Sequence, residues 1–165
     1  NKKQVQLLGS GVILREVEAA AEILYNDFGV NSDVWSVTSF NELRREGLDA
    51  SRWSMLHPEE EARLSYVESC LDGKGPVIAS TDHIKLFADQ IRPFVKGTYN
   101  VLGTDGFGRS DTRAQLRHFF EVNRYWVVVS ALSALAKDGV IDASVVSGAI
   151  AKFGLDPEKP NPVTC

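Results

Sequence analysis

Strand-like and helix-like segments alternate along most of the chain, and this alternation constrains the fold more than any other feature. Short apolar runs at residues 5–8, 34–37, 76–80 and 99–102 predict strands, and longer segments with helical spacing separate them. A helix between two strands forms a crossover connection, which leaves the two strands parallel. We therefore expect an α/β fold in three layers, with a mostly parallel sheet and helices on both faces.

The first two helical regions are defined by apolar spacing and by residues that end helices. An amphipathic helix is expected at residues 13–28, with Glu16 on its polar face. Residues 43–71 are expected to be helical in pieces. One break is predicted near Gly47 and another before Pro58, because the residue before a proline is pushed out of the helical region.

The later helices follow the third and fourth predicted strands. Asp82 is expected to cap the helix after the third strand. The buried face of that helix is predicted to contain Ile84, Phe87, Ile91 and Phe94. Further helices are predicted at residues 112–120, 123–137 and 142–153. We expect a single α/β domain over residues 1–155 and an extended tail over residues 156–165, which contain three prolines.

Charge and hydropathy exclude several classes of function. The chain has 165 residues and a net charge of -4, and it has no basic cluster of the kind that nucleic-acid binding needs. Its longest apolar run, residues 125–136, is shorter than the roughly 20 residues of a membrane span. Cys70 and Cys165 form no metal-binding or disulfide pattern, so we expect reduced thiols and a cytoplasmic protein without nucleic-acid or membrane partners.

Candidate reactive residues fail the tests of spacing. Gly9-Ser10-Gly11 follows a strand, as a phosphate-binding turn does. However, Leu14 occupies the third glycine position of G-x-G-x-x-G, and the P-loop signature is absent from the sequence. The three histidines show no metal-ligand spacing. We interpret the first glycine motif as a tight turn and expect no catalytic, cofactor-binding or metal-binding residues in this chain.

The segment GTDGFGRSDTR, residues 103–113, is here called the glycine loop. Asp105 and Asp111 do not match the calcium-loop pattern, since no glutamate follows at the required distance. The glycines permit backbone angles that other residues resist. Ser110 or Asp111 is expected to cap the helix that begins near Thr112. The loop is therefore predicted to be a structured turn.

Two regions are candidates for an interface. Phe107 stands between two glycines, which favours insertion into a neighbouring surface, and Arg109 is available to a carboxylate. The helix at residues 123–137 is apolar on nearly every side, so other elements must pack against two of its sides. One of these sides is covered either by a partner, which would contact the first turn of the helix, or by the last helix and the tail of the same chain. The interface candidates are Asp105, Phe107, Arg109, Ser110, Tyr125 and Trp126.

Several ordered segments resemble one enzyme family. They read VQLLGSGVILREVEAAAEIL, DVWSVTSFNELRREG, RWSMLHP, STDHIKLFADQIRPFV and GTDGFGRSDTRAQLRHFFEVN. These segments are similar to the carboxy-terminal domain of the homodimeric pyruvate dehydrogenase decarboxylating component, which depends on thiamine diphosphate. The core D-x-F-G-x-S, formed by Asp105, Phe107, Gly108 and Ser110, also resembles a loop of transketolase carboxy-terminal domains.

The resemblance implies a transketolase-like fold and a parent enzyme that oxidatively decarboxylates pyruvate and acetylates a lipoyl group. In that family thiamine diphosphate and magnesium lie between two other domains. The Gly-Asp-Gly motif and the Asn-Asn pair that hold them are absent from this sequence. The resemblance thus implies an assembly and dimerisation domain, inactive alone. Its implied partners are the other domains of its chain, a second subunit and the acyltransferase component.

A binding module is the alternative function. In a doubly wound sheet, ligands collect at the carboxyl ends of the strands, and both glycine-containing loops are predicted to follow strands. Under this alternative, a stand-alone α/β module would bind a small anion between Ser10, Arg109 and Ser110.

Overall fold

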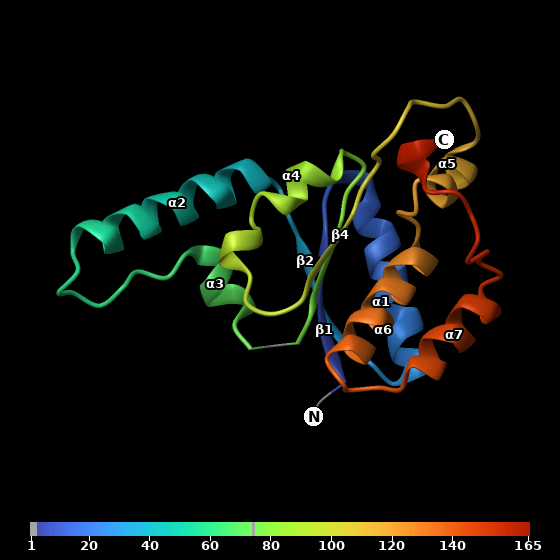
Figure 1. The fold of residues 1–165 in the computed structure, drawn as a ribbon, viewed down its shortest axis with the longest axis horizontal. Helices are drawn as coiled ribbons and strands as arrows, with labels where there is room; N and C mark the ends of the chain where they lie inside the picture. Colours follow the sequence, from blue (N-terminus) through green and yellow to red (C-terminus); the bar gives the residue numbers. More distant parts are fainter. Residues whose placement is uncertain (1–2, 74) are drawn as a thin grey trace.

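The computed structural model describes residues 3–73 and 75–165, and a four-stranded parallel sheet forms its centre (Figure 1). The strands are β1 (Gln4–Gly9), β2 (Asn31–Ser36), β3 (Val77–Ser80) and β4 (Tyr99–Leu102). Their order is β2-β1-β3-β4, and each neighbouring pair is parallel. The chain therefore changes direction across the sheet between β1 and β3. The prediction of an α/β fold with a parallel sheet is confirmed.

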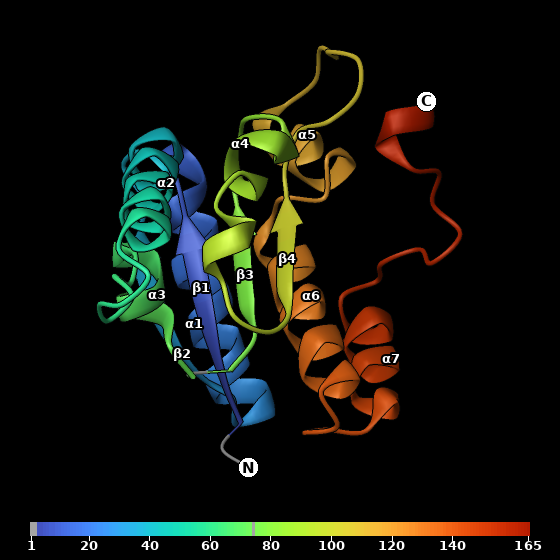
Figure 2. The same ribbon diagram turned by 60° about the vertical axis from the view of Figure 1, so that its left-hand side comes forward.

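Helices cover both faces of the sheet, as Figures 1 and 2 show. One layer contains α1 (Leu14–Phe28), α6 (Arg124–Lys137) and α7 (Ala143–Lys152). The other contains α2 (Phe40–Leu56), α3 (Tyr66–Leu71) and α4 (Lys85–Asp89). Helix α5 (Arg113–Phe119) follows the glycine loop, and short 3-10 turns are η1 (Gly11–Ile13), η2 (Arg92–Phe94) and η3 (Pro162–Thr164).

Helix α6 is apolar on nearly every side because elements of the same chain surround it. It packs against α1 and α7 and approaches β3 and β4. Its fully buried side chains include Val127, Val128, Leu132 and Leu135. Burial within the chain therefore accounts for most of this helix. At its first turn, Tyr125 is still 39% exposed.

The opposite layer corrects two predictions about α2 and α4. Helix α2 runs through Gly47 without a break. A Cβ atom at Gly47 would lie 2.6 Å from the Phe94 ring, so the glycine lets this ring approach the helix. Helix α4 is shorter than expected, and Ile84 and Phe87 are 47% and 41% exposed. The burial expected of those two residues is wrong, while Ile91 and Phe94 are buried as predicted.

Strand β2 begins three residues before its predicted start. Its first residues, Asn31 to Asp33, are polar and therefore do not show the apolar pattern of a strand. Asp33 nevertheless belongs to the sheet, where its carboxylate accepts hydrogen bonds from the side-chain amides of Gln4 (3.1 Å) and Gln6 (2.8 Å). An edge strand tolerates polar side chains because it is only partly covered.

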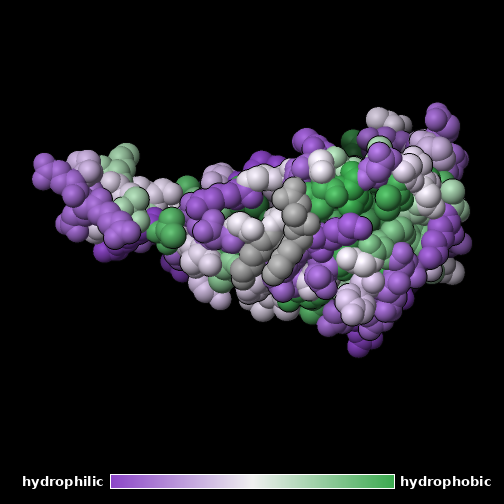
Figure 3. Space-filling view, turned by 90° about the horizontal axis from the view of Figure 1, so that it is seen from below, coloured by the Kyte–Doolittle hydropathy of each residue, from purple (hydrophilic) through white to green (hydrophobic). Residues whose placement is uncertain are grey.

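A narrow projection extends from the α2 side of the molecule (Figures 1 and 3). It consists of the second half of α2 and the return segment that leads to α3. We call residues 48–64 the arm. Within the arm only Ala50 is buried, so this part of the chain lies outside both hydrophobic cores.

The tail folds back along the layer that contains α6. Its backbone turns at residues 157–158 and ends in η3. Nζ of Lys159 donates hydrogen bonds to the Phe119 carbonyl (2.9 Å) and to Oε1 of Glu121 (3.0 Å). The division into a domain of residues 1–155 and a tail of residues 156–165 stays a prediction.

Candidate functional site

The carboxyl ends of the strands gather the candidate residues. Because the strands are parallel, the segments that follow β1, β3 and β4 all emerge at one edge of the sheet. Ser10 follows β1, Asp82 follows β3 and the glycine loop follows β4. This edge includes the change of direction between β1 and β3, where doubly wound folds bind ligands.

The first part of the glycine loop is tied to the segment before α4. Oδ1 of Asp105 accepts a hydrogen bond from the backbone N–H of Lys85 at 2.7 Å. The Thr104 hydroxyl donates to the carbonyl of Asp82 at 2.8 Å. Asp82 does not cap α4 as expected, because the N-cap is Ile84 and the carboxylate comes from the loop. Asp105 is therefore an anchoring residue of the loop.

The second part of the loop starts α5 through a threonine. Thr112 is the N-cap, and its hydroxyl accepts a hydrogen bond from the N–H of Gln115 at 3.3 Å. The carboxylate of Asp111 accepts only from the adjacent Thr112 N–H in the described structure. The prediction of Ser110 or Asp111 as cap is wrong by one or two residues. Ser110 is exposed.

Between these two fixed ends, the loop presents an aromatic residue to solvent. The Phe107 side chain is 79% exposed, the largest value among the exposed large apolar residues of the described chain. Gly106 has a φ of 119°, and a Cβ atom there would lie 2.4 Å from the Pro162 carbonyl oxygen. The loop thus contacts the tail. The guanidinium of Arg109 lies 4.2 Å from the centre of the Phe119 ring, a cation–π contact.

A cavity of about 530 Å³ opens beside the loop. Arg109, Arg113 and Arg117 line it together with Asp82 and Asp111. The structure does not bring together the three residues of the predicted anion site. Of the described residues that line this cavity, Arg109 is one, but neither Ser10 nor Ser110 is. The Ser10 hydroxyl instead donates to the Thr81 hydroxyl at 2.8 Å.

A buried carboxylate joins α1 to the helices that follow the loop. Glu16 was expected on the polar face of α1, but it is only 6% exposed. Arg117 donates to Oε1 at 3.1 Å, and the side chain and backbone N–H of Arg124 donate to Oε2 at 3.1 and 2.9 Å. Burial alone would raise the pKa of Glu16, but these hydrogen bonds and the charges of both arginines lower it overall. Sequence spacing gave no signal for this cluster.

Tyr125 and Trp126 lie at the start of α6, near the tail. The ring of Tyr125 lies 4.9 Å from that of Phe153, and Nζ of Lys159 lies 5.7 Å from the Trp126 ring. Nε1 of Trp126 is buried and has no hydrogen-bond partner among the described residues. Trp126 is therefore largely engaged by its own chain, whereas Tyr125 is accessible.

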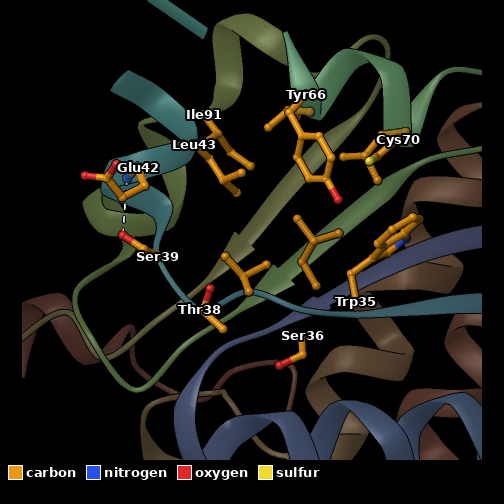
Figure 4. A pocket seen from close by; sticks show the side chains of 13 residues that line it. Trp35, Ser36, Thr38, Ser39, Glu42, Leu43, Tyr66, Cys70 and Ile91 are labelled. Carbon is orange, nitrogen blue, oxygen red and sulfur yellow. Dashed lines mark hydrogen bonds between the residues drawn. The ribbon is translucent and has the colours of Figure 1, made fainter. Parts of the chain in front are cut away.

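A second cavity, of about 340 Å³, lies between the end of β2 and helices α2 and α3 (Figure 4). Most of its lining is apolar, with Trp35 and Tyr66 near the Cys70 thiol. A hydrogen bond with Cys70 raises the pKa of Tyr66. At the other end, Ser39 caps α2 by accepting from the N–H of Glu42. This recess fits an apolar group better than a charged substrate.

The described side chains at this edge provide no donor set for magnesium. Across residues 3–73 and 75–165 there is no group of three histidine, cysteine, aspartate or glutamate residues that could hold a metal ion. The two aspartates of the larger cavity share its lining with three arginines. Cys70 and Cys165 carry free thiols. The described helices are also too short or too polar to cross a membrane.

Comparisons with known proteins show which family this sequence matches. The profile of the family described as "Transketolase-like TK C-terminal domain" matches residues 1–123. Pyruvate dehydrogenase E1 components of Pseudomonas aeruginosa and Escherichia coli K12 are 64% and 58% identical over 163 residues, which is 98% of this chain. The chain spans 18% of the length of each, in the carboxy-terminal region.

A solved structure supports the fold. A protein titled "Split gene transketolase, inactive beta4 tetramer" superposes with a TM-score of 0.56. The match covers 82% of this chain and 40% of that one, at 16% sequence identity. At this identity the likeness concerns the fold alone.

Proposed function

The chain belongs to the family of transketolase-like C-terminal domains, and from this premise we propose that it is the assembly and dimerisation unit of a pyruvate dehydrogenase E1 component. The high identity to E1 components over nearly the whole chain supports this parent. The parent would decarboxylate pyruvate oxidatively in the cytoplasm and acetylate a lipoyl group on the acyltransferase component. The chemistry of thiamine diphosphate and magnesium belongs to the rest of that enzyme.

The observation that carries the assembly role is the geometry of the glycine loop. Asp105 and Thr112 fix its two ends through backbone N–H groups, while Phe107 between them is 79% exposed. A loop that is ordered by its own chain and still exposes a large aromatic ring fits a contact element. Arg109 and Ser110 beside it supply a polar rim. Tyr125 is the second exposed aromatic candidate.

The proposal is tested in the full-length protein with Phe107→Ser. We expect the dimer dissociation constant to rise about thirtyfold, as for removal of an interface anchor worth about 2 kcal/mol. Analytical ultracentrifugation measures the dissociation constant, and activity should return at protein concentrations that restore the dimer. Tyr25→Ser is the control, because Tyr25 is 65% exposed near the end of α1, outside the glycine loop. Unchanged dimerisation of Phe107→Ser would refute the role of the loop.

One observation supports the alternative of a small-anion module. Three arginines line the larger cavity, at the edge of the sheet where ligands bind in such folds. Guanidinium groups bind phosphate and carboxylate well, but two aspartates in the same lining oppose an anion. Titration with inorganic phosphate, followed by the NMR shifts of the arginine side chains, tests this candidate. Saturable shifts that Arg113→Gln removes would support it.

A further inference from the structure

The arm, residues 48–64, is an ordered projection that lies outside both hydrophobic cores of the described residues. Figure 1 shows α2 and the segment after it extending well beyond the sheet and the helices that cover it, and Figure 3 shows the same projection in space-filling form. Helix α2 contacts α3 and α4, and its buried residues are Phe40, Gly47 and Ala50. Beyond Ala50 the next buried residue is Ser65.

Local contacts keep the arm in shape. The guanidinium of Arg63 lies 3.7 Å from the centre of the Trp53 ring, and the His57 ring stacks on Trp53 at 4.2 Å. The backbone N–H of Arg63 donates to the Ser54 hydroxyl at 2.9 Å. These contacts tie the return segment to the helix without an apolar core. The arm therefore has a defined surface.

That surface is apolar in patches and acidic at its tip. Met55 is 70% exposed, Leu56 51% and Leu64 57%. Three consecutive glutamates, residues 59–61, follow the end of the helix and are all exposed. The arm thus carries exposed large apolar side chains and an acidic tip, with Arg52 and Arg63 also exposed. This combination matches an interface anchor with a charged rim.

We propose that the arm docks on the part of the E1 polypeptide that precedes this chain, in an apolar recess bordered by lysine or arginine. This inference rests on the proposed function. The E1 relatives align with nearly all of this chain, yet the chain spans only 18% of their length, so most of each relative lies outside it. A second copy of the arm is a poor occupant, because it would bring two triple-glutamate tips together.

Met55 offers a direct test in the full-length protein, because it is the single methionine of this chain. The protein is treated with hydrogen peroxide, and oxidation of the Met55 peptide is followed by mass spectrometry in native and urea-unfolded samples. We expect oxidation about tenfold slower in the native protein, which corresponds to about 1.4 kcal/mol of docking free energy. A native rate equal to the unfolded rate would overturn the proposal, since the chain itself leaves Met55 exposed.

A photocrosslinker identifies the occupant. Benzoylphenylalanine replaces Leu56 in the full-length protein, and the crosslinked peptides are sequenced. Adducts with peptides that precede residue 1, in the same or the second subunit, support the proposal. Adducts with residues 1–165 of a second copy, or with the acyltransferase, overturn it. The same replacement at Tyr25, which is 65% exposed on α1, measures the background from an exposed site outside the arm.

The two proposals fail in distinguishable ways. Pyruvate decarboxylation and lipoyl acetylation are measured on the same full-length preparation. An active enzyme with an unprotected Met55 retains the E1 assignment and removes the docking role of the arm. A full-length protein that lacks the activity removes the E1 assignment, whatever Met55 shows.

Discussion

The α6 side of the molecule and its two exposed projections are stabilised in different ways. Around α6, apolar side chains from β1, α1 and α7 close a core, and Glu16 with its two arginines forms a buried polar link. The glycine loop and the arm are instead held by backbone hydrogen bonds and ring contacts, and their large apolar residues face solvent. The residues that stabilise this chain therefore differ from those that we propose to contact a partner.

The sharpest test of this comparison is truncation of one apolar side chain in each region. Leu135 is fully buried in α6, so Leu135→Ala should lower the free energy of unfolding by about 3 kcal/mol. Met55→Ala in the arm should change it by less than about 0.5 kcal/mol. Urea unfolding followed by circular dichroism measures both. Similar losses for the two variants would show that the arm belongs to the cooperative core.

Substitution of Glu16 should lower the free energy of unfolding by an intermediate amount. Glu16→Gln removes the charge that Arg117 and Arg124 face, and we expect a loss of about 2 kcal/mol because the arginines are only partly buried. Glu18→Gln, at an exposed position of the same helix, is the matched control and should change stability by less than about 0.5 kcal/mol. Equal effects of the two substitutions would remove the special role of Glu16.

The stability difference between the native protein and Glu16→Gln should change with pH in one direction. The pKa of Glu16 is lowered in the folded protein, because the arginines outweigh the effect of burial. Its stabilising contribution is therefore fully present above the ordinary glutamate pKa of about 4.3 and is lost as the pH falls through the lowered value. The stability difference between the native protein and Glu16→Gln should shrink on acidification in that range. A difference that grows on acidification would contradict the assignment.

Periodicity predicted the sheet and most helices because both depend on local apolar spacing. The strands β1 and β3 are buried almost throughout, which is typical of central strands covered on both faces. Edge strand β2 was predicted too short, since its first residues are polar and the pairing with β1 cannot be read from them. The break expected at Gly47 failed because the glycine is needed for contact with Phe94, which lies far away in sequence.

The sequence identified several residues of the candidate site, but it did not indicate which residues they bond. Asp105 was recognised as part of an ordered loop, yet its bond to the Lys85 N–H joins positions 20 residues apart. Glu16 was expected in solvent, because its partners lie more than 100 residues later in the chain. Lys159 anchors the tail from between two prolines, where no local pattern marks a contact. These three interactions are long-range polar ones, which helical and strand periods do not encode.

The smallest effect is expected at the anchor of the glycine loop. Asp105→Ala leaves the Lys85 N–H without its acceptor, at a cost of about 1 kcal/mol, and Asp105→Asn should lose less because its amide oxygen can still accept. Hydrogen exchange of the Lys85 amide should accelerate about fivefold in Asp105→Ala.

Asp111→Ala is the matched control for this anchor, since Asp111 bonds only the adjacent Thr112 N–H among the described residues. Its effect on the Lys85 amide should be absent. If Asp105→Ala also leaves that amide unchanged, the loop is held by its other bonds, such as that of Thr104 to the Asp82 carbonyl. The exposed position of Phe107 would then depend on the α4 segment as a whole. If the amide accelerates as expected, one carboxylate orients the aromatic residue that we assign to the interface.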